Sequence, residues 1–333
     1  MLYCSRSSAH HSQRRSGGTG RRRGLKILRG LASCGFDSLL RHQLHVTRSL
    51  SFHADYRCQN SGDCCTAQWP IADDEGGLLP RDAHGCAFHN AGLHRCEVHA
   101  AHGHDALPLA CRQFPRVTIT DPRGVSVALS CYCPTARGML DTFTGDITIV
   151  ENPTAFPERG EYVGLDARTS LPPALCPNVL MDWDSWWEWE RLSVELWNLS
   201  EPPRQILDRL SIAVEAIRTW RPGQGELIDR VHEAHESART LHHAPSPPAP
   251  APSHPAPAPS HLAPRTAHLF LACHSFASWP AHLGSGLRTW LRSLETVLFL
   301  LEQDWTVAEV DLWLRHYAEP RLLAKTWSRV ELN

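Results

Sequence analysis

The sequence is poorest in lysine and in long apolar runs. Only two lysines occur, Lys26 and Lys325, against 31 arginines. This scarcity excludes the phosphate-binding loop GxxxxGK(S/T) and argues against a lysine that forms a Schiff base with a substrate. No apolar run approaches the roughly 18 residues that a membrane-spanning helix needs, so the sequence predicts no membrane contact. The formal net charge of -2 gives the whole surface no field that would attract nucleic acid.

Several catalytic signatures are absent as well. No GxGxxG follows a predicted strand, and no GxSxG elbow marks a nucleophilic serine. Asp229, His232 and His235 lie three residues apart on a predicted helix, but this spacing is not the HExxH of zinc proteases. The sequence therefore assigns no residue as a catalytic group.

What the sequence has in excess is cysteine. Its 333 residues favour roughly two domains, and an apolar fraction of 42% is enough for a buried core. Eight of the twelve cysteines are concentrated in one quarter of the chain: Cys58, Cys64, Cys65, Cys86, Cys96, Cys111, Cys131 and Cys133. The other four stand outside every motif, and we expect them to be small apolar residues without a role at a site. They are Cys4, Cys34, Cys176 and Cys273.

Residues 1–50 predict a disordered basic arm. This stretch holds nine arginines and Lys26 against a single acid, Asp37, and it is rich in serine and glycine. Three other interpretations stay open: a translation start placed too early, an arm that binds nucleic acid, or a twin-arginine export signal over residues 21–26. Beyond this arm we expect no nucleic-acid partner.

The fold class predicted from these patterns is α+β. An irregular, cysteine-rich module over residues 51–150 contains one small β-hairpin, with strands at 117–120 and 125–129 around a turn at 121–124. Because so few apolar residues occur in the module, crosslinks through a metal or through disulfides must stabilise its fold. A mainly α-helical part follows it to the end of the chain.

Apolar residues at helical spacing predict two helices in a region that spans residues 151–241. They cover residues 183–199 and 203–220, and we expect them to pack as an antiparallel pair. The first is rich in tryptophan. Large aromatic side chains at this spacing are typical of a buried core, so we expect these tryptophans to pack inside the protein and not to stack on a ligand.

Two further segments complete the chain. Residues 242–268 predict a proline-rich linker of polyproline II type, which forms neither helix nor sheet. Residues 269–333 predict a C-terminal helical pair, with one helix at 287–301 and a second one that opens with a capping box between Thr306 and Glu309.

Three kinds of chemistry explain clustered cysteines: disulfides, metal ligation or a redox-active pair. The adjacent Cys64 and Cys65 argue against a disulfide framework, because neighbouring cysteines rarely bond to each other and would need two separate partners. The lack of a clear secretory signal favours a reducing compartment, the cytoplasm, where clustered thiols more often bind metal. Zinc and an iron–sulfur cluster both suit thiolate ligands, and the spacing does not decide between them.

Five ordered segments carry a resemblance to a known family. They read YRCQNSGDCC at 56–65, GCAF at 85–88, CEVH at 96–99, LPLACRQFPR at 107–116 and SCYCPTA at 130–136. Together they resemble the YkgJ-type cysteine-cluster family, a zinc- or iron-chelating domain. With Trp69 soon after the cysteine pair, the segments are also similar to flagellin lysine-N-methylases, which transfer methyl groups from S-adenosylmethionine to protein lysines.

The resemblance implies a set of metal ligands. Carried over position by position, it assigns seven cysteines to the chelating site: Cys58, Cys64, Cys65, Cys86, Cys96, Cys111 and Cys133. Cys131 lies two residues before Cys133, so on an extended chain the two side chains point the same way, and we include it as an eighth candidate. Among the histidines between the cysteines, His99 is the nearest candidate for completing a site.

Three functions are consistent with this sequence. The main expectation is a cytoplasmic metal-binding protein that holds zinc or an iron–sulfur cluster through its thiolates. The first alternative, implied by the resemblance, is a protein-lysine N-methyltransferase with S-adenosylmethionine as cosubstrate and a protein as substrate. The second is an interaction module, in which a structural metal supports a helical part that recruits a protein partner. The sequence sets no oligomeric state.

Overall fold

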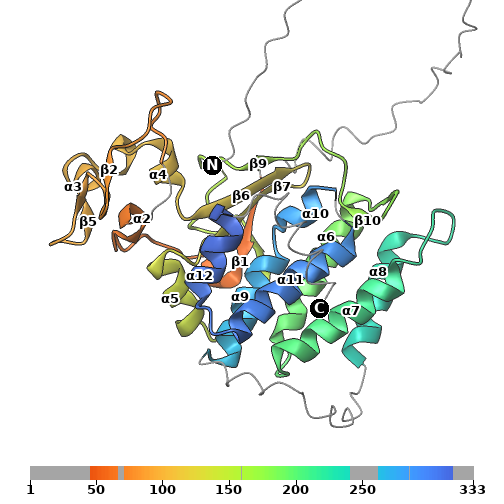
Figure 1. Cartoon of the computed structure of the whole chain (residues 1–333). Coiled ribbons are helices and arrows are strands. Elements are labelled where there is room, and N and C mark those ends of the chain that lie inside the picture. Colours follow the sequence, from red (N-terminus) through yellow and green to blue (C-terminus); the bar gives the residue numbers. More distant parts are fainter. Residues whose placement is uncertain (1–45, 67–70, 159, 241–261, 285, 318–333) are drawn as a thin grey trace, which may run out of the picture.

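A mixed five-stranded sheet organises the body of the molecule (Figure 1). The structure is a computed structural model that describes residues 46–66, 71–158, 160–240, 262–284 and 286–317. The strand order is β8-β1-β7-β6-β9, with β1 parallel to β7 and β6 antiparallel to β7. The strands are β1 (Thr47–Leu50), β6 (Arg116–Asp121), β7 (Gly124–Leu129), β8 (Ile149–Glu151) and β9 (Leu165–Asp166).

The predicted hairpin is confirmed as β6 and β7. The two strands pair over their whole length and are joined by the two residues 122 and 123. Gly124 has a φ of +123°, a backbone conformation that favours glycine at the end of the turn. Alternation along β7 buries both faces of the sheet, because Ala128 joins the large apolar core while Val127 and Leu129 join a smaller one.

The first strand shows that one predicted boundary is wrong. Residues 47–50, expected to belong to the basic arm, form the buried strand β1 between β7 and β8. Thr47, Arg48 and Ser49 show no apolar alternation, so the pattern did not indicate a strand. Arg48 is nevertheless buried because its guanidinium lies beside the carboxylate of Asp121 on β6. The rest of the predicted arm, residues 1–45, lies outside the described residues.

Helices fill most of the second half of the chain. The helices predicted at 183–199 and 203–220 are confirmed as α6, with a 3-10 extension at Leu196–Asn198, and as α7. The helix predicted at 287–301 is α11, and the capping box that opens α12 is formed. The helices are α5 (Pro134–Thr142), α6 (Trp183–Glu195), α7 (Pro203–Ile217), α8 (Leu227–Thr240), α9 (Pro264–Ser275), α10 (Trp279–His282), α11 (Leu287–Glu302) and α12 (Val307–Leu312). None of these described helices combines the length and the apolar content needed to cross a bilayer.

The large apolar core joins the sheet to these helices, and tryptophan dominates it. Four tryptophans are fully buried: Trp186, Trp189, Trp197 and Trp290. Trp189 of α6 and Trp290 of α11 pack edge to face with ring centroids 5.6 Å apart. The indole N–H of Trp197 donates to Ser275 Oγ at 2.9 Å. The tryptophan-rich helix therefore belongs to the core, as its spacing predicts.

The helical part departs from expectation in its packing and boundaries. α8 packs against both α6 and α7 through its buried Val231, Ala234 and Ala238, in place of the direct pair that we expected. α9 begins at Pro264, inside the predicted linker, because a proline in the first helical turn loses no intrahelical hydrogen bond. The C-terminal pair is therefore a set of four helices, α9 to α12. Linker residues 241–261 lie outside the described residues.

A second departure lies between the hairpin and α6. Three short strands occupy the start of the region 151–241 that we expected to be helical. One is β9 at the edge of the main sheet, and the other two, β10 (Ala174–Cys176) and β11 (Val179–Leu180), pair with each other. Strands of two or three residues carry too little alternation to be recognised in a sequence.

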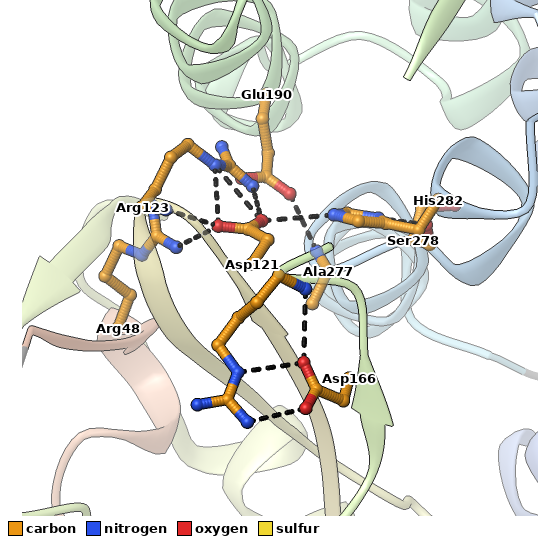
Figure 2. Close-up of polar contacts among 9 residues, drawn as sticks. Arg48, Asp121, Arg123, Asp166, Glu190, Ala277, Ser278 and His282 are labelled. Carbon is orange, nitrogen blue, oxygen red and sulfur yellow. Dashed lines mark hydrogen bonds and ion pairs between the residues drawn. The ribbon is translucent and has the colours of Figure 1, made fainter. Parts of the chain in front are cut away.

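A buried carboxylate at the end of β6 gathers cations from three parts of the fold (Figure 2). Arg123 Nη2 donates to Asp121 Oδ2 at 2.6 Å, and Arg48 Nη2 of β1 donates to Oδ1 at 3.5 Å. His282 Nε2 of α10 lies 3.1 Å from Oδ2, and its Nδ1 lies 3.0 Å from the carbonyl oxygen of Ser278. Both ring nitrogens of His282 therefore face oxygen atoms.

The same network reaches α6 through Arg123. Its Nη1 donates to Glu190 Oε2 at 3.1 Å, and Glu190 Oε1 accepts the backbone N–H of Ala277 at 2.9 Å. The Arg123 guanidinium also lies 5.6 Å from the ring centroid of Trp183 and 5.9 Å from that of Trp187. Carboxylates and indole faces thus replace the water that these buried charges have lost.

The charges of the network keep the Asp121 carboxyl group ionised although it is buried. Burial alone would raise the pKa of Asp121, but Arg123, His282 and Arg48 outweigh it and hold that pKa well below its usual range. A carboxyl group whose pKa is lowered in the folded state stabilises the fold above its ordinary pKa of about 4. This contribution is lost only as the pH falls through the lowered value, so the network persists in mild acid.

Asp166, the last residue of β9 (Figure 2), and Arg168, two residues later, repeat the local geometry of Asp121 and Arg123 in an exposed setting. In each pair the arginine backbone N–H and its guanidinium donate to the aspartate two residues earlier, with Nη2–Oδ2 distances of 2.6 Å in both. The side chains of Asp166 and Arg168 are 56% and 54% exposed, whereas those of Asp121 and Arg123 are 0% and 7% exposed. The two pairs thus differ in burial and in the further contacts of the buried pair with Arg48, His282 and Glu190.

We predict that Asp121→Asn lowers the free energy of unfolding by about 3 kcal/mol or more, because it removes the carboxylate that Arg48 and His282 contact and leaves Arg123 with Glu190 alone. Urea denaturation followed by tryptophan fluorescence measures the change. Asp166→Asn is the matched control and is expected to leave the free energy of unfolding nearly unchanged, since water screens the exposed pair. Equal effects of the two substitutions would show that burial does not set the strength of this contact.

Candidate metal centre

Residues 57–113 form a lobe beside the sheet, which we call the cysteine lobe. Figure 1 shows its elements gathered at one side of the molecule, away from the C-terminal helices. The elements are α2 (Asp63–Thr66), β2 (Arg81–Asp82), β3 (Gly85–Cys86), β4 (His89–Asn90), β5 (Arg95–Cys96), α3 (Glu97–His102), a 3-10 turn (His104–Ala106) and α4 (Leu109–Gln113). Each strand has only two residues, so the backbone pairing within the lobe is slight.

The cysteine lobe lacks an apolar core of its own. None of its described residues belongs to either apolar core of the protein. Its buried apolar side chains are Cys65, Ile71, Cys86 and Leu107, two of which are thiols. Leu78 and Leu93, in contrast, are 66% and 58% exposed. Hydrophobic burial therefore contributes little to the stability of this part of the chain.

Five of the predicted ligands come together in the lobe. They are Cys64 and Cys65 on α2, Cys86 on β3, Cys96 on β5 and Cys111 on α4. The thiols of Cys64, Cys86 and Cys96 all act on the pKa of Cys111, which requires the four side chains to lie near one another. Cys86 and Cys96 act on the pKa of Cys65 in the same way. All five thiols are free.

These thiols differ in acidity. A hydrogen bond with Cys65 lowers the pKa of Cys64, and the same bond, together with burial, raises the pKa of Cys65. Burial and the neighbouring thiols raise the pKa of Cys111 to about 12. Cys64 thus becomes the thiolate, the form that binds metal, more readily than Cys65 or Cys111.

Two glycines permit the close packing around the cysteine pair. Gly85 has a φ of +124°, and a Cβ there would collide with the carbonyl oxygen of Cys65 and the Cα of Thr66. Gly62 has a φ of +78°, and a Cβ there would lie 2.7 Å from His89 Nε2. These positions therefore need glycine. Because Gly85 can approach the backbone of Cys65 closely, the next residue, Cys86, lies near Cys65.

Tyr56 links the two predicted ligands at the edge of the lobe, Cys58 and Cys133. Its hydroxyl lies 3.6 Å from Cys133 Sγ, and burial followed by the two thiols raises the pKa of the phenol. Cys58 is exposed, and its sulfur accepts the backbone N–H of Asn60 at 3.4 Å. Cys133 is buried at the N-cap of α5. The two thiols thus share a polar partner at the boundary between lobe and sheet.

Cys131 lies apart from these seven. It belongs to the large apolar core and forms a side-chain hydrogen bond with Cys273 of α9, a thiol that sequence reasoning excluded. His53 Nε2 lies 4.0 Å from Cys273 Sγ. The expectation that Cys131 and Cys133 point the same way is wrong, because residues 131 and 132 form a turn and not an extended segment.

Arg112 and Gln113 connect the C-terminal end of the lobe by hydrogen bonds to the residues before β9. Arg112 donates to the carbonyl oxygen of Leu107 at 2.6 Å and to the carboxylate of Glu161 at 3.1 Å. The Gln113 amide donates to the carbonyl oxygen of Glu161 at 2.8 Å and accepts the N–H of Val163 at 3.2 Å. Both side chains therefore hold α4, with its Cys111, to the segment that leads into β9.

His89, one of the five histidines that recur every five residues between the cysteines, is better placed as a candidate ligand than His99. It lies opposite Cys96 in the β4–β5 pair, and among the described residues its buried Nε2 has no hydrogen-bond partner. His99, the histidine that the spacing favoured, lies instead on α3 near His104. The signal for His89 is the cross-strand register, which cannot be read from strands of two residues.

The described residues contain no group of three histidine, cysteine or acidic side chains that already stands in a metal-holding arrangement. The thiols of the lobe are close enough to influence one another, and bound metal would draw them closer. Comparisons with models of known families, with curated proteins and with solved structures found no match for this chain. Trp69, part of the family resemblance, lies outside the described residues.

We predict that, in reduced protein at neutral pH with the lobe folded, Cys64 is alkylated at least about tenfold faster than Cys111, because its lowered pKa leaves a larger thiolate fraction. Isotope-coded alkylation with mass spectrometry measures both rates in one sample. Exposed Cys58 gives the reference rate. Cys131 and Cys273, which are fully buried, should react only after unfolding, and their early labelling would contradict the placement described above.

Proposed function

We propose that the chain is a metal-binding protein whose cysteine lobe is held together by zinc or by an iron–sulfur cluster. The observation that carries this proposal is the meeting of five free thiols in a lobe without an apolar core. Thiolates bind both kinds of metal centre strongly. The proposal also places the protein in a reducing compartment, such as the cytoplasm, where thiols stay unpaired.

The energetic argument concerns how so small a lobe stays folded. A segment of this size cannot bury enough apolar surface to offset its conformational entropy, so it needs a covalent or metal crosslink. The two-residue strands and short helices of the lobe do not supply the stabilisation that an apolar core would give. Structural zinc contributes on the order of 10 kcal/mol to the folding of small domains, which is sufficient.

The residues that would hold the metal are Cys64, Cys65, Cys86, Cys96 and Cys111, with His89 as a further donor. The donor set fits a thiophilic metal, because sulfur dominates it and the orphaned His89 nitrogen adds a borderline-soft ligand. When bound, zinc would act as a structural crosslink and an iron–sulfur cluster would supply one-electron chemistry. Cys58 and Cys133 stay predicted ligands at the edge of the lobe, whereas the contact with Cys273 favours a core role for Cys131.

The test is the metal content of full-length protein purified without oxygen. We expect stoichiometric zinc, or iron with acid-labile sulfide and a broad absorbance near ~400 nm. The double variant Cys64→Ser and Cys65→Ser should lose most of this metal, while Cys176→Ser, which alters a buried thiol outside the lobe, should keep it. Full retention of metal by the double variant would overturn the ligand assignment.

A second readout separates the lobe from the body. Trypsin cleaves after arginine, and the lobe contains Arg81 and Arg95 in its two short strand pairs. We predict that chelation of the metal speeds cleavage at these sites, because the lobe loses its crosslink. The body has its own core, so Arg209, buried on α7, should stay protected in the same digest. Unchanged cleavage of the lobe after chelation would argue that the metal is not structural.

The two alternatives stay predictions. Methyl transfer from labelled S-adenosylmethionine to flagellin or to lysate proteins would support a protein-lysine N-methyltransferase with a protein substrate. A partner that is captured specifically and still binds after the metal is removed would support an interaction module. Neither outcome would conflict with metal binding by the lobe.

A further inference from the structure

An open recess lined by tryptophan and carboxylates lies at the start of α12, in the C-terminal helical part of the chain. The loop after α11 and the residues of α12 border a volume of about 360 Å³. Asp304, Trp305, Glu309, Leu312 and Trp313 line it. The recess and the cysteine lobe share no residues, because those of the lobe lie in the first half of the chain.

The two indoles border the recess at right angles. The ring centroids of Trp305 and Trp313 are 6.4 Å apart, and the ring planes are inclined by 81°. Perpendicular rings do not stack on each other, and a cation over the face of either ring, within ~6 Å of its centroid, would make a cation–π contact. Trp305 is 39% exposed, so an incoming group can reach it from solvent.

The charge of the recess favours a cation. Asp304 and Glu309 are both exposed, and neither forms an ion pair with a cation of the described residues. Hydrogen bonds from the backbone and hydroxyl of Thr306 lower the pKa of Glu309, so this carboxylate is charged at neutral pH. Two negative charges and two aromatic faces attract the same kind of ligand, a positively charged one.

We propose that this recess binds an alkylated ammonium group. A guanidinium has five N–H groups to satisfy, whereas one of the four carboxylate oxygens of the recess, Glu309 Oε2, already accepts from Thr306 N at 2.8 Å and Oγ1 at 2.7 Å. A quaternary ammonium has no N–H to satisfy, and its methyl groups pack against indole and Leu312. The group can belong to a free head-group compound or to a trimethylated lysine of a peptide.

The primary test compares choline with its uncharged isostere 3,3-dimethyl-1-butanol on the full chain at constant ionic strength. Line broadening of the ligand methyl protons and calorimetry report binding. We expect choline to bind with a dissociation constant of about 1 to 10 mM, and the isostere at least about tenfold more weakly. Equal binding of both compounds, or no binding of choline, would overturn the proposal.

Variants locate the site. Trp305→Leu should weaken choline binding about fivefold or more, since it removes one aromatic face. Asp304→Asn with Glu309→Gln should also weaken it while keeping the fold, because Asn tolerates the positive φ of 62° at position 304 and Gln can still accept from Thr306. Phe299→Leu alters an exposed aromatic side chain that does not line the recess and should have no effect. Unchanged binding by the first two variants would place the contact elsewhere.

The source of the ligand is decided by a second titration. A peptide with one trimethylated lysine, compared with the unmodified peptide and with choline, reports whether the chain contributes contacts beyond the head group. Tighter binding of the modified peptide supports a protein ligand, and equal affinity for choline supports a free compound. Binding of the unmodified peptide as strongly as the trimethylated one would contradict recognition of an alkylated ammonium.

Discussion

The carboxylate of Asp121 is the point at which the layers of the body meet. It takes up the charge of Arg48 from β1, of Arg123 from the hairpin turn and of His282 from α10. Arg123 extends the contact to Glu190 on α6 (Figure 2). Apolar contacts have no direction, whereas these hydrogen bonds and ion pairs are directional and are satisfied in one arrangement of sheet and helices. We interpret the network as the device that fixes this arrangement.

The body and the cysteine lobe are stabilised by different means. In the body, a large apolar core with four fully buried tryptophans joins the sheet to the helices, and the ring centroid of one of them, Trp186, lies 6.0 Å from the Arg123 guanidinium. The lobe has neither tryptophan in its described residues nor a share in either core. Two of the four buried apolar side chains of the lobe are cysteine thiols.

Local patterns were enough to predict much of the fold. The hairpin, α6, α7, α11 and the capping box of α12 each depend on residues close together in the sequence, and each is confirmed. β1 was missed because its burial depends on Arg48 meeting Asp121, which lies 73 residues away. The contact between Cys131 and Cys273, and the position of His89 opposite Cys96, also depend on tertiary pairing that no local pattern encodes. The five gathered thiols, in contrast, are among those that the ordered cysteine motifs named.

The amide of Gln113 limits how far the lobe can open by itself. It bonds the backbone of Glu161 and Val163 much as an adjacent strand would, immediately before β6 begins. Local unfolding that starts at α2 would therefore stop at this residue, and the amides of β6 would exchange with solvent only when the whole body unfolds. The chain thus contains two cooperative units, with their border at one glutamine side chain.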